Sequence, residues 1–393
     1  MADREAGWDI MLVAGEASGD LHAANLVRAL RDLRRDVRCY GMGAGCMRAA
    51  GVEILIDSSR LAVVGIVEIL VHYREIKAAL RKLQGILETR RPDLLILIDY
   101  PEFNLRLAAT AKKAGVKVLY YVSPQVWAWR PGRVKKIGRR VDMMAVVFAF
   151  EAPFYEEAGV PVRFVGHPLV DEARPTMTRT EALGCFGLDS NSKTIGLFPG
   201  SRVSEITRLM PVMVESATLL RARFPDAQFV LPVAPGLDRG LIEGYLDDAT
   251  LPITILENQS LYDVTLVCDA IVTASGTATL QIALMGTPMV IIYKVSWLSY
   301  WIARRLVTVK HIGLANIVAG KSVVREFIQN DVQAKPITDE IGRLLTDQAY
   351  AQNMRREMSG ANKALGEAGG SYKAAQLALE MINSSCRTDK RFA

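Results

Sequence analysis

Cysteine and histidine are scarce in this chain, which has five cysteines and four histidines among 393 residues. The cysteines are odd in number, scattered, and include no CxxC pair, so we expect neither a disulfide framework nor a zinc site. A reducing compartment fits this usage. The sequence also has no D-x-D triplet and no acidic cluster, so we expect chemistry that uses no metal and no cofactor.

A clear export or membrane-spanning segment is also missing from the pattern. The first ten residues, MADREAGWDI, are charged and do not have the composition of a signal peptide. Residues 270–293 carry no charge, but Gly276, Gly286 and Pro288 interrupt them. Such a pattern is typical of a strand, a turn, a helix and a second strand rather than of a membrane span. We therefore expect no transmembrane segment here.

Positive charge is unevenly distributed along the chain. Residues 1–170 contain 25 Lys and Arg against 19 Asp and Glu, whereas residues 171–393 contain 23 basic and 23 acidic residues. The whole net charge of +6 therefore lies in the first part. This indicates an anionic partner there, which is a phosphorylated substrate, a membrane surface or a nucleic acid.

The stretch with the clearest chemical meaning is TIGLFPGSRVSEITRLMPVM, at residues 194–213. Thr194–Phe198 predicts a buried strand, Pro199–Ser201 a tight turn, and the residues from Val203 a helix. Such a turn directs backbone N–H groups and the positive end of a helix dipole at one point, and Arg202 adds a guanidinium suited to phosphate oxygens. A phosphate site is one interpretation; an ordinary turn of an α/β domain is the other.

Two further segments have the same strand–turn–helix pattern. Ile10–Ala14 leads into GEASGD at residues 15–20, with Glu16 and Ser18 at the tip, and residues 273–281 form the other. The first of them is not a G-x-G-x-x-G fingerprint, so a dinucleotide site is not supported.

Asp99 stands at the end of a strand predicted over Asp93–Ile98 and just before a helix that starts near Pro101. The carboxyl ends of parallel strands form the ligand-binding edge of an α/β sheet. Asp99 is therefore a candidate general base, and a helix N-cap is the alternative that stays open.

Three segments combine basic residues with apolar or aromatic ones. Residues 60–71 (RLAVVGIVEILV) and 297–310 (WLSYWIARRLVTVK) fit either buried helices or surfaces that meet lipid. Residues 127–140 place six basic residues beside Trp127 and Trp129. Single-stranded nucleic acid can bind such a pattern, but no nucleic-acid-binding module accompanies it, so we expect no nucleic acid partner.

The order of the elements predicts the fold class. Strands are expected at 10–14, 39–41, 93–98, 118–122, 141–150, 162–165, 194–198, 228–232, 253–256, 270–273 and 289–293, with helical patterns between them. This alternation predicts an α/β protein of two Rossmann-like domains with mostly parallel sheets that face each other across a cleft. We place the domains at residues 1–170 and 171–369, and expect a C-terminal helix within 370–393 that packs back on the first domain.

Eight motifs follow one another along the chain. They are MLVAGEASGDLH (11–22), LAVVGIVEIL (61–70), DYPEFN (99–104), YYVSPQVWAWRPGRVKKIGR (120–139), GHPLVD (166–171), LFPGSRVSEI (197–206), ASGTATLQ (274–281) and Asn316 within LANIVAG. In this order they resemble the lipid-A-disaccharide synthase family over nearly the whole chain.

The resemblance implies a GT-B glycosyltransferase. Such an enzyme joins UDP-2,3-diacylglucosamine to 2,3-diacylglucosamine 1-phosphate with inversion, and it forms a β-1,6-linked disaccharide and UDP. The resemblance also implies a cytoplasmic, peripheral protein on the anionic inner-membrane surface of a Gram-negative bacterium. The oligomeric state stays open, and a homo-oligomer is one possibility.

The resemblance also assigns roles to the candidate residues. Asp99 would be the catalytic base that deprotonates the acceptor hydroxyl. The diphosphate and nucleoside of the donor would be bound by Gly200, Ser201, Arg202, Ser275, Gly276, Thr277, Gln281 and Asn316. Glu16 and Ser18 would line the acceptor side. The acyl chains and the membrane would meet Val63, Val64, Ile66, Val67 and Leu70.

Gln281 departs from the family pattern, which usually has Glu at this position. In GT-B transferases that carboxylate accepts hydrogen bonds from the ribose, and a neutral amide would weaken UDP binding by about tenfold. Two alternatives stay open. The apolar segment 61–71 argues against an enzyme like a UDP-sugar 2-epimerase, and Asp99 and Arg202 argue against a catalytically weakened lipid-binding relative.

Overall fold

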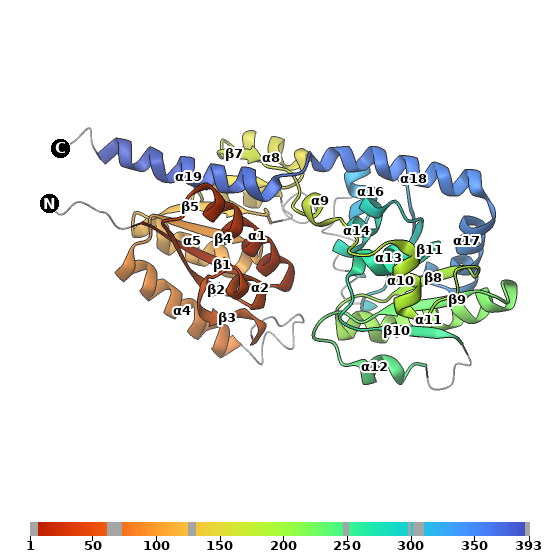
Figure 1. The fold of residues 1–393 in the computed structure, drawn as a ribbon. Coiled ribbons are helices and arrows are strands. Elements are labelled where there is room, and N and C mark those ends of the chain that lie inside the picture. Colours follow the sequence, from red (N-terminus) through yellow and green to blue (C-terminus); the bar gives the residue numbers. More distant parts are fainter. Residues whose placement is uncertain are drawn as a thin grey trace. The chain divides into compact units, whose positions relative to one another are not determined.

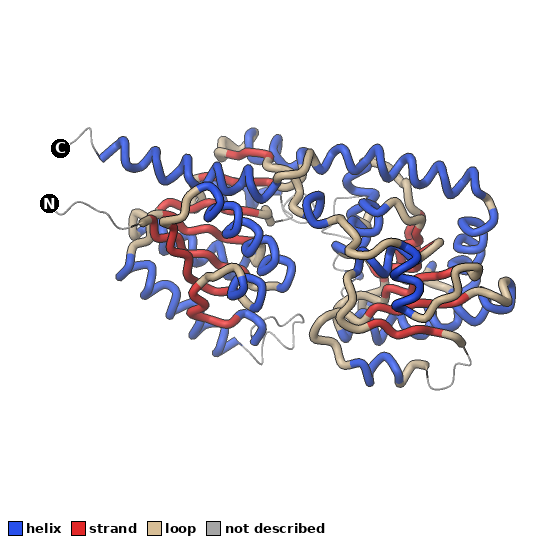
Figure 2. The backbone as a smooth tube through the Cα atoms, viewed as in Figure 1, coloured by secondary structure: helices blue, strands red, loops and turns tan. Residues whose placement is uncertain are grey.

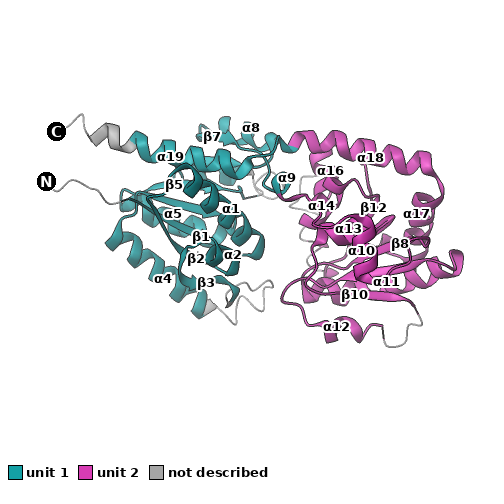
Figure 3. Ribbon diagram, in the orientation of Figure 1, with its two compact units in different colours: residues 1–171, 365–393 teal, residues 172–364 magenta. Residues whose placement is uncertain are grey.

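The computed structural model describes residues 7–60, 73–124, 131–246, 251–297, 300–301 and 310–389. The chain divides into two compact units, coloured separately in Figure 3. Unit 1 comprises residues 1–171 and 365–393, and unit 2 comprises residues 172–364. The chain therefore enters unit 2 after Asp171, one residue after the expected boundary, and returns to unit 1 at Leu365.

Unit 1 is built on a seven-stranded parallel sheet in the order β3-β2-β1-β4-β5-β6-β7 (Figures 1 and 2). Its strands are β1 (Trp8–Ala14), β2 (Val37–Gly43), β3 (Glu53–Asp57), β4 (Leu94–Ile98), β5 (Lys117–Tyr121), β6 (Met143–Val146) and β7 (Val162–Phe164). Its α-helices are α1 (Ala17–Leu33), α2 (Gly45–Ala49), α4 (Tyr73–Arg90), α5 (Pro101–Lys113), α7 (Val134–Gly138), α8 (Ala152–Glu156), α9 (Leu169–Glu172) and α19 (Gly370–Asp389). The central strand β4, LLILI, is fully buried, as expected for a parallel strand covered by helices on both faces.

The C-terminal helix α19 belongs to unit 1, where it packs against α1. The Lys117 ammonium donates to the Met381 carbonyl at 3.1 Å and to the Ser384 hydroxyl at 3.0 Å. Arg163 forms an ion pair with Glu380 at 2.7 Å. The last helix thus completes the cover of the first sheet, although it begins more than 200 residues after β7 in the sequence.

Unit 2 is built on a six-stranded parallel sheet in the order β10-β9-β8-β11-β12-β13. Its strands are β8 (Thr194–Phe198), β9 (Gln228–Pro232), β10 (Ile253–Leu256), β11 (Ala270–Ala274), β12 (Met289–Tyr293) and β13 (Arg325–Ile328). Its α-helices are α10 (Arg179–Phe186), α11 (Val203–Arg223), α12 (Arg239–Glu243), α13 (Leu261–Val267), α14 (Thr277–Met285), α16 (Leu314–Ala319), α17 (Ala334–Thr346) and α18 (Gln348–Asn362). Two parallel α/β units confirm the predicted fold class.

The expected strand over residues 141–150 is wrong in its second half. The strand β6 ends at Val146, and a 3₁₀ helix follows at Ala149–Glu151. The buried Glu151 carboxylate accepts hydrogen bonds from the Phe148 N–H at 3.2 Å and the Ser123 hydroxyl at 2.6 Å. These bonds turn the chain out of the sheet.

The predictions for the apolar and aromatic segments are tested by the structure only in part. Residues 270–293 form β11, α14 and β12, as predicted. Among the described residues, no helix is both long and apolar enough to span a bilayer. The predictions for residues 61–71, for Trp127 and Trp129, and for residues 302–309 fall outside the described part of the chain.

Candidate functional site

Asp99 lies at the topological switch point of unit 1. β1 and β4 are neighbours in the sheet, and the strand order runs in opposite directions on either side of them. Ligands of open α/β sheets bind beyond the carboxyl ends of the strands at such a point. The turn after β1 contains Glu16, and the turn after β4 contains Asp99.

The backbone at Asp99 is unusual. Asp99 and Tyr100 both have φ of +47°, and Val122 at the end of the neighbouring strand has φ of +61°. Each non-glycine residue in this left-handed region costs about 1–3 kcal/mol, and such residues cluster at functional sites. The N-cap of α5 is Tyr100 rather than Asp99, so the N-cap interpretation of Asp99 is wrong.

The surroundings of Asp99 make its carboxyl a stronger proton acceptor. Burial, followed by the negative charge of Glu16, raises its pKa from 3.8 to about 6. A hydrogen bond with the Tyr100 backbone and the charge of His22 act in the opposite direction. A carboxyl group with this pKa is ionised near neutral pH and takes up a proton more readily than an ordinary aspartate, which suits a general base.

The turn after β1 lies against the turn after β4. A Cβ atom on Gly15 would lie 2.4 Å from the Tyr100 ring, so only glycine allows this approach. Glu16 is the N-cap of α1 and is partly buried, while Ser18 is exposed. The structure therefore brings Glu16 and Asp99 together, and it leaves the Ser18 side chain at the surface of the unit.

Two buried histidines of unit 1 lie close together, and the sequence analysis did not select them. The rings of His22 and His167 meet edge to face with centroids 6.3 Å apart, and Phe148 packs on His167 at 5.0 Å. Burial, with the charge of His22, lowers the pKa of His167 to about 3, so this ring is neutral. Its Nδ1 accepts the Leu169 N–H at 3.2 Å, which is a structural role. Only the position of His22 within the motif at 11–22 could have drawn attention to it.

The first turn of α11, which follows β8 and the turn at Gly200–Arg202, contains a carboxylate that the sequence analysis missed. The Glu205 carboxylate accepts the Ser201 N–H at 3.0 Å and pairs with the Arg202 guanidinium at 3.2 Å. Gly200 has φ of +107°, and a Cβ atom there would lie 2.2 Å from the same carboxylate. The Ser201 N–H and the Arg202 guanidinium, which are candidate phosphate donors, thus both contact the Glu205 carboxylate. In the sequence, the position of Glu205 four residues after Ser201 could have indicated this contact.

The second candidate turn of unit 2 is the neighbour of the first. β8 and β11 are adjacent parallel strands, and the strand order reverses between them, so both turns lie at the switch point of this sheet. Gly276 and Thr277 begin α14. Ser275 donates its backbone N–H to the Ile292 carbonyl and its hydroxyl to the Ile312 carbonyl, both at 3.1 Å. The structure therefore brings the two candidate diphosphate turns together.

Asn316 is fully buried and has its hydrogen-bonding capacity engaged within unit 2. Its amide nitrogen donates to the Val324 carbonyl at 2.7 Å and to the Glu326 carboxylate at 2.8 Å, and its oxygen accepts the N–H groups of Val323 and Val324 at 2.8 Å. Glu326 in turn accepts the N–H groups of Ile312 and Gly313 at 3.0 and 2.9 Å. Asn316 therefore holds Glu326 and, through it, the backbone next to the Ile312 carbonyl that Ser275 contacts.

Gln281 lies on α14, about one turn before the end of that helix. It is partly buried, and its amide nitrogen lies 3.4 Å from the Tyr262 hydroxyl. This is a weak hydrogen bond by distance. The Gln281 side chain is therefore less firmly held than that of Asn316.

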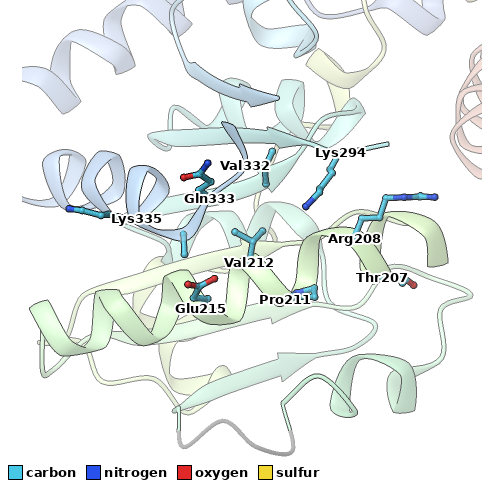
Figure 4. Close-up of a pocket in the computed structure, with 10 residues that line it drawn as sticks. Thr207, Arg208, Pro211, Val212, Glu215, Lys294, Val332, Gln333 and Lys335 are labelled. Carbon is cyan, nitrogen blue, oxygen red and sulfur yellow. The ribbon is translucent and has the colours of Figure 1, made fainter. Parts of the chain in front are cut away.

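Unit 2 also has a pocket of about 630 Å³ between α11 and the segment that enters α17 (Figure 4). In Figure 4, Val212 and Glu215 project from α11 toward Val332 and Gln333. Arg208, Lys294 and Lys335 also line the pocket. Its described lining includes none of the candidate site residues.

Among the described residues, no group of three or more His, Cys, Asp and Glu side chains could hold a metal ion. The candidate residues that the structure places next to one another are carboxylates in unit 1, and backbone N–H groups with a guanidinium in unit 2. The five candidate lipid-facing residues, Val63, Val64, Ile66, Val67 and Leu70, lie outside the described residues.

Comparison with known proteins gives one consistent picture. A family model described as "Lipid-A-disaccharide synthetase" matches residues 10–381. The lipid-A-disaccharide synthase of Geobacter sulfurreducens is 57% identical over 95% of this chain and 97% of the relative. That of Geobacter metallireducens is 55% identical over the same shares of the two chains.

Solved structures share the fold at low identity. UDP-GlcNAc 2-epimerase from Neisseria meningitidis bound to UDP-GlcNAc superposes with a TM-score of 0.65 and 12% identity, over 96% of this chain and 100% of that chain. At this identity the similarity shows the fold alone. Together with the two parallel sheets, it confirms the GT-B class that the sequence predicts.

Proposed function

The chain belongs to the lipid-A-disaccharide synthetase family, and as such it is a glycosyltransferase. From this premise we propose that it transfers 2,3-diacylglucosamine from UDP-2,3-diacylglucosamine to 2,3-diacylglucosamine 1-phosphate. The reaction inverts the anomeric centre and forms the β-1,6-linked disaccharide 1-phosphate and UDP. The observation that carries the proposal is the Asp99 carboxylate, which lies at the switch point of unit 1 with its pKa raised to about 6.

Asp99 acts as the general base in this proposal. Its carboxylate takes the proton of the acceptor hydroxyl while that oxygen forms a bond to the anomeric carbon of the donor. The bond between this carbon and the β-phosphate oxygen breaks at the same time, and its electron pair leaves with UDP. Inversion requires that the base and the departing UDP lie on opposite faces of the sugar ring.

Unit 2 holds the donor in this proposal. The turns at Gly200–Arg202 and Ser275–Thr277 lie side by side at the starts of α11 and α14. The backbone N–H groups at these helix starts are the candidate donors, except that of Ser275, which donates to the Ile292 carbonyl. These donors and the Arg202 guanidinium would stabilise the negative charge that develops on the diphosphate. The Glu205 carboxylate binds the Ser201 N–H and the Arg202 guanidinium in this structure. A bound diphosphate must therefore displace Glu205 from these two groups.

The two candidate nucleoside contacts receive different roles. Gln281 would meet the ribose directly, since its side chain is only weakly held. Asn316 would act as a positioning residue, because its amide holds Glu326 and, through it, the backbone at Ile312 and Gly313. The nucleoside would then contact the backbone segment at Ile312 and Gly313 that Asn316 orients.

The membrane contact is a further part of the proposal. We place the protein at the cytoplasmic face of a Gram-negative inner membrane, with residues 61–71 as the apolar contact and the positive charge of the first 170 residues as the electrostatic one. A Val64→Glu variant should lose co-sedimentation with anionic vesicles. Binding equal to that of the unmodified protein would contradict the role of this segment.

The test of the function is a turnover assay with both diacylglucosamine substrates in the presence of EDTA. The unmodified protein should form disaccharide and UDP, and Asp99→Asn should lower kcat by between about a hundredfold and ten-thousandfold. Asparagine suits this position because it tolerates the left-handed backbone better than most residues.

The other outcomes of this assay are equally informative. Product from both the unmodified protein and Asp99→Asn would support the proposed reaction and contradict the role of Asp99 as its base. No product from the unmodified protein, with UDP bound, would favour an epimerase-like or a lipid-binding protein. Loss of product on addition of EDTA would contradict the metal-free mechanism.

A further inference from the structure

Two fully buried side chains from neighbouring elements hold the main chain at Asp99. Asn104, in the first turn of α5, donates its amide nitrogen to the Ile98 carbonyl at 3.2 Å and to the Asp99 carbonyl at 2.7 Å. Tyr120, in β5, donates its hydroxyl to the same Asp99 carbonyl at 2.5 Å. Two side-chain donors therefore converge on one carbonyl oxygen at the point where the chain leaves the sheet.

This convergence occurs where the backbone most needs support. Asp99 and Tyr100 are consecutive residues in the left-handed region, each with φ of +47°. Such a conformation persists in non-glycine residues only when the surrounding structure determines it. The Asp99 N–H still belongs to the sheet, since it donates to the Tyr121 carbonyl at 3.3 Å. Beyond this bond, Tyr120 and Asn104 hold the turn through the Asp99 carbonyl, and Asn104 also binds the Ile98 carbonyl.

We propose that Tyr120 and Asn104 are positioning residues for the Asp99 carboxylate. By binding the Asp99 carbonyl they maintain the left-handed turn, and the turn keeps the carboxylate in its partly buried place beside Glu16. This inference rests on the proposed function of Asp99 as the base. Neither side chain touches the reacting atoms in this scheme, because both hydrogen bonds end on the backbone.

The Tyr120 hydroxyl is suited to this role. Burial and the nearby charge of Asp99 raise its pKa well above the ordinary value, so it stays protonated and remains a donor. Phenylalanine fills the same volume without the hydroxyl. A Tyr120→Phe variant therefore separates the hydrogen bond from the packing of the ring.

Loss of this hydrogen bond should change both the place and the proton affinity of the carboxylate. A turn that relaxes toward ordinary backbone angles exposes the Asp99 carboxyl to more water. Because burial is the main cause of its raised pKa, greater exposure lowers that pKa toward 3.8. A misplaced base also lowers the rate of the chemical step.

The kinetic test compares Tyr120→Phe with Tyr40→Phe. Tyr40 is a buried tyrosine of β2 in the same sheet, so it receives the same chemical change away from Asp99. Tyr120→Phe should lower kcat by between about tenfold and a hundredfold. It should leave the KM for the UDP donor unchanged and move the acid limb of kcat/KM to lower pH by about half a unit or more. Tyr40→Phe should behave like the unmodified protein.

A second measurement does not depend on activity. The protein is labelled with ¹³C at its aspartate carboxyl groups and titrated by NMR, and the Asp99 signal is identified by its loss in Asp99→Asn. The midpoint should fall in Tyr120→Phe and in Asn104→Ala, and it should stay unchanged in Tyr40→Phe. This titration decides the positioning role even if the turnover assay contradicts the proposed function.

An Asp99 titration and a pH profile unchanged in Tyr120→Phe would overturn the inference. An equal loss of kcat in Tyr120→Phe and Tyr40→Phe, with no movement of the acid limb, would also overturn it. That result would indicate a general loss of packing.

Discussion

The two units of this protein share a topology and differ in what they place at the switch point of the sheet. In unit 1 the turns after β1 and β4 carry two carboxylates, Glu16 and Asp99. In unit 2 the turns after β8 and β11 carry backbone donors and the Arg202 guanidinium. In the proposed function, the same scaffold therefore serves one point that accepts a proton and another that accepts an anion, and the difference comes from a few turn residues.

The backbones of the two turns differ for a related reason. Unit 2 reaches a positive φ with Gly200, which has no side chain and lets an acceptor come close to the N–H groups. Unit 1 reaches it with Asp99 and Tyr100, which carry side chains and therefore strain. A base must have a side chain, so unit 1 cannot use glycine at this position, and extra hydrogen bonds hold the strained turn.

The largest expected effect is that of Asp99→Asn, which should lower the activity and raise the stability of the protein. Folding raises the pKa of Asp99 from 3.8 to about 6, so the ionised form is disfavoured in the folded protein. This penalty is absent below the unfolded pKa and grows as the pH rises through the folded one. The variant should lose activity, while its free energy of unfolding near neutral pH rises by up to about 3 kcal/mol.

Thermal unfolding at low and at neutral pH checks this prediction. The gain in Tm should appear near neutral pH and disappear below about pH 4, where Asp99 is protonated in both the folded and the unfolded state. A Tm gain of the same size at both pH values would contradict the electrostatic explanation.

Glu205→Gln tests the anion site of unit 2. Removal of the carboxylate charge leaves Arg202 and the Ser201 N–H more available to a diphosphate, so UDP should bind roughly tenfold more tightly in calorimetry. Glu215→Gln, on the same helix about three turns away, is the control for the change in net charge. Equal tightening in both variants would show that only the net charge matters.

Gln281→Glu tests the departure from the family pattern. A carboxylate that accepts ribose hydroxyls binds them more strongly than an amide oxygen does, so UDP affinity should rise by up to about tenfold. Calorimetry measures this directly. An unchanged affinity would mean that position 281 does not contact the ribose.

The smallest expected effect belongs to Glu16→Gln, which removes the second carboxylate of unit 1. Its negative charge raises the pKa of Asp99, so its removal lowers that pKa. Asp99 must be ionised to act, and the acid limb of kcat/KM should therefore move to lower pH by about half a unit. Glu88→Gln, at an exposed position of α4, should leave the limb in place.

The sequence predicts most of the strands, the edge strands β7 and β10 included, but it misses two other edge strands. The strands β8, β9 and β12 have the predicted bounds, because each is a short apolar run buried within its sheet. The edge strands β3 (EILID) and β13 (REFI) were not predicted. Each is half exposed and contains acidic or basic residues, so its apolar pattern is too weak to separate it from a loop.

Some residues of the candidate site were likewise predicted from the sequence, and others were not. The strand–turn–helix pattern located Asp99, Glu16 and Arg202 at the correct edge of each sheet, because the carboxyl ends of parallel strands share one edge. Glu205, Glu326 and the hydroxyl of Tyr120 were missed, since each binds backbone groups, and no side-chain motif predicts such a bond.

The sequence alone determined the α/β class, the order of the strands along the chain, the family resemblance and the turns where the chemistry is expected. The tertiary structure decided which turns become neighbours, that the pKa of Asp99 is raised, that Glu205 binds the Ser201 N–H and Arg202, and that Asn316 is buried. The physical reason is that local pattern follows from residues a few positions apart. Desolvation, charge coupling and hydrogen bonds to backbone groups depend instead on residues that only folding brings together.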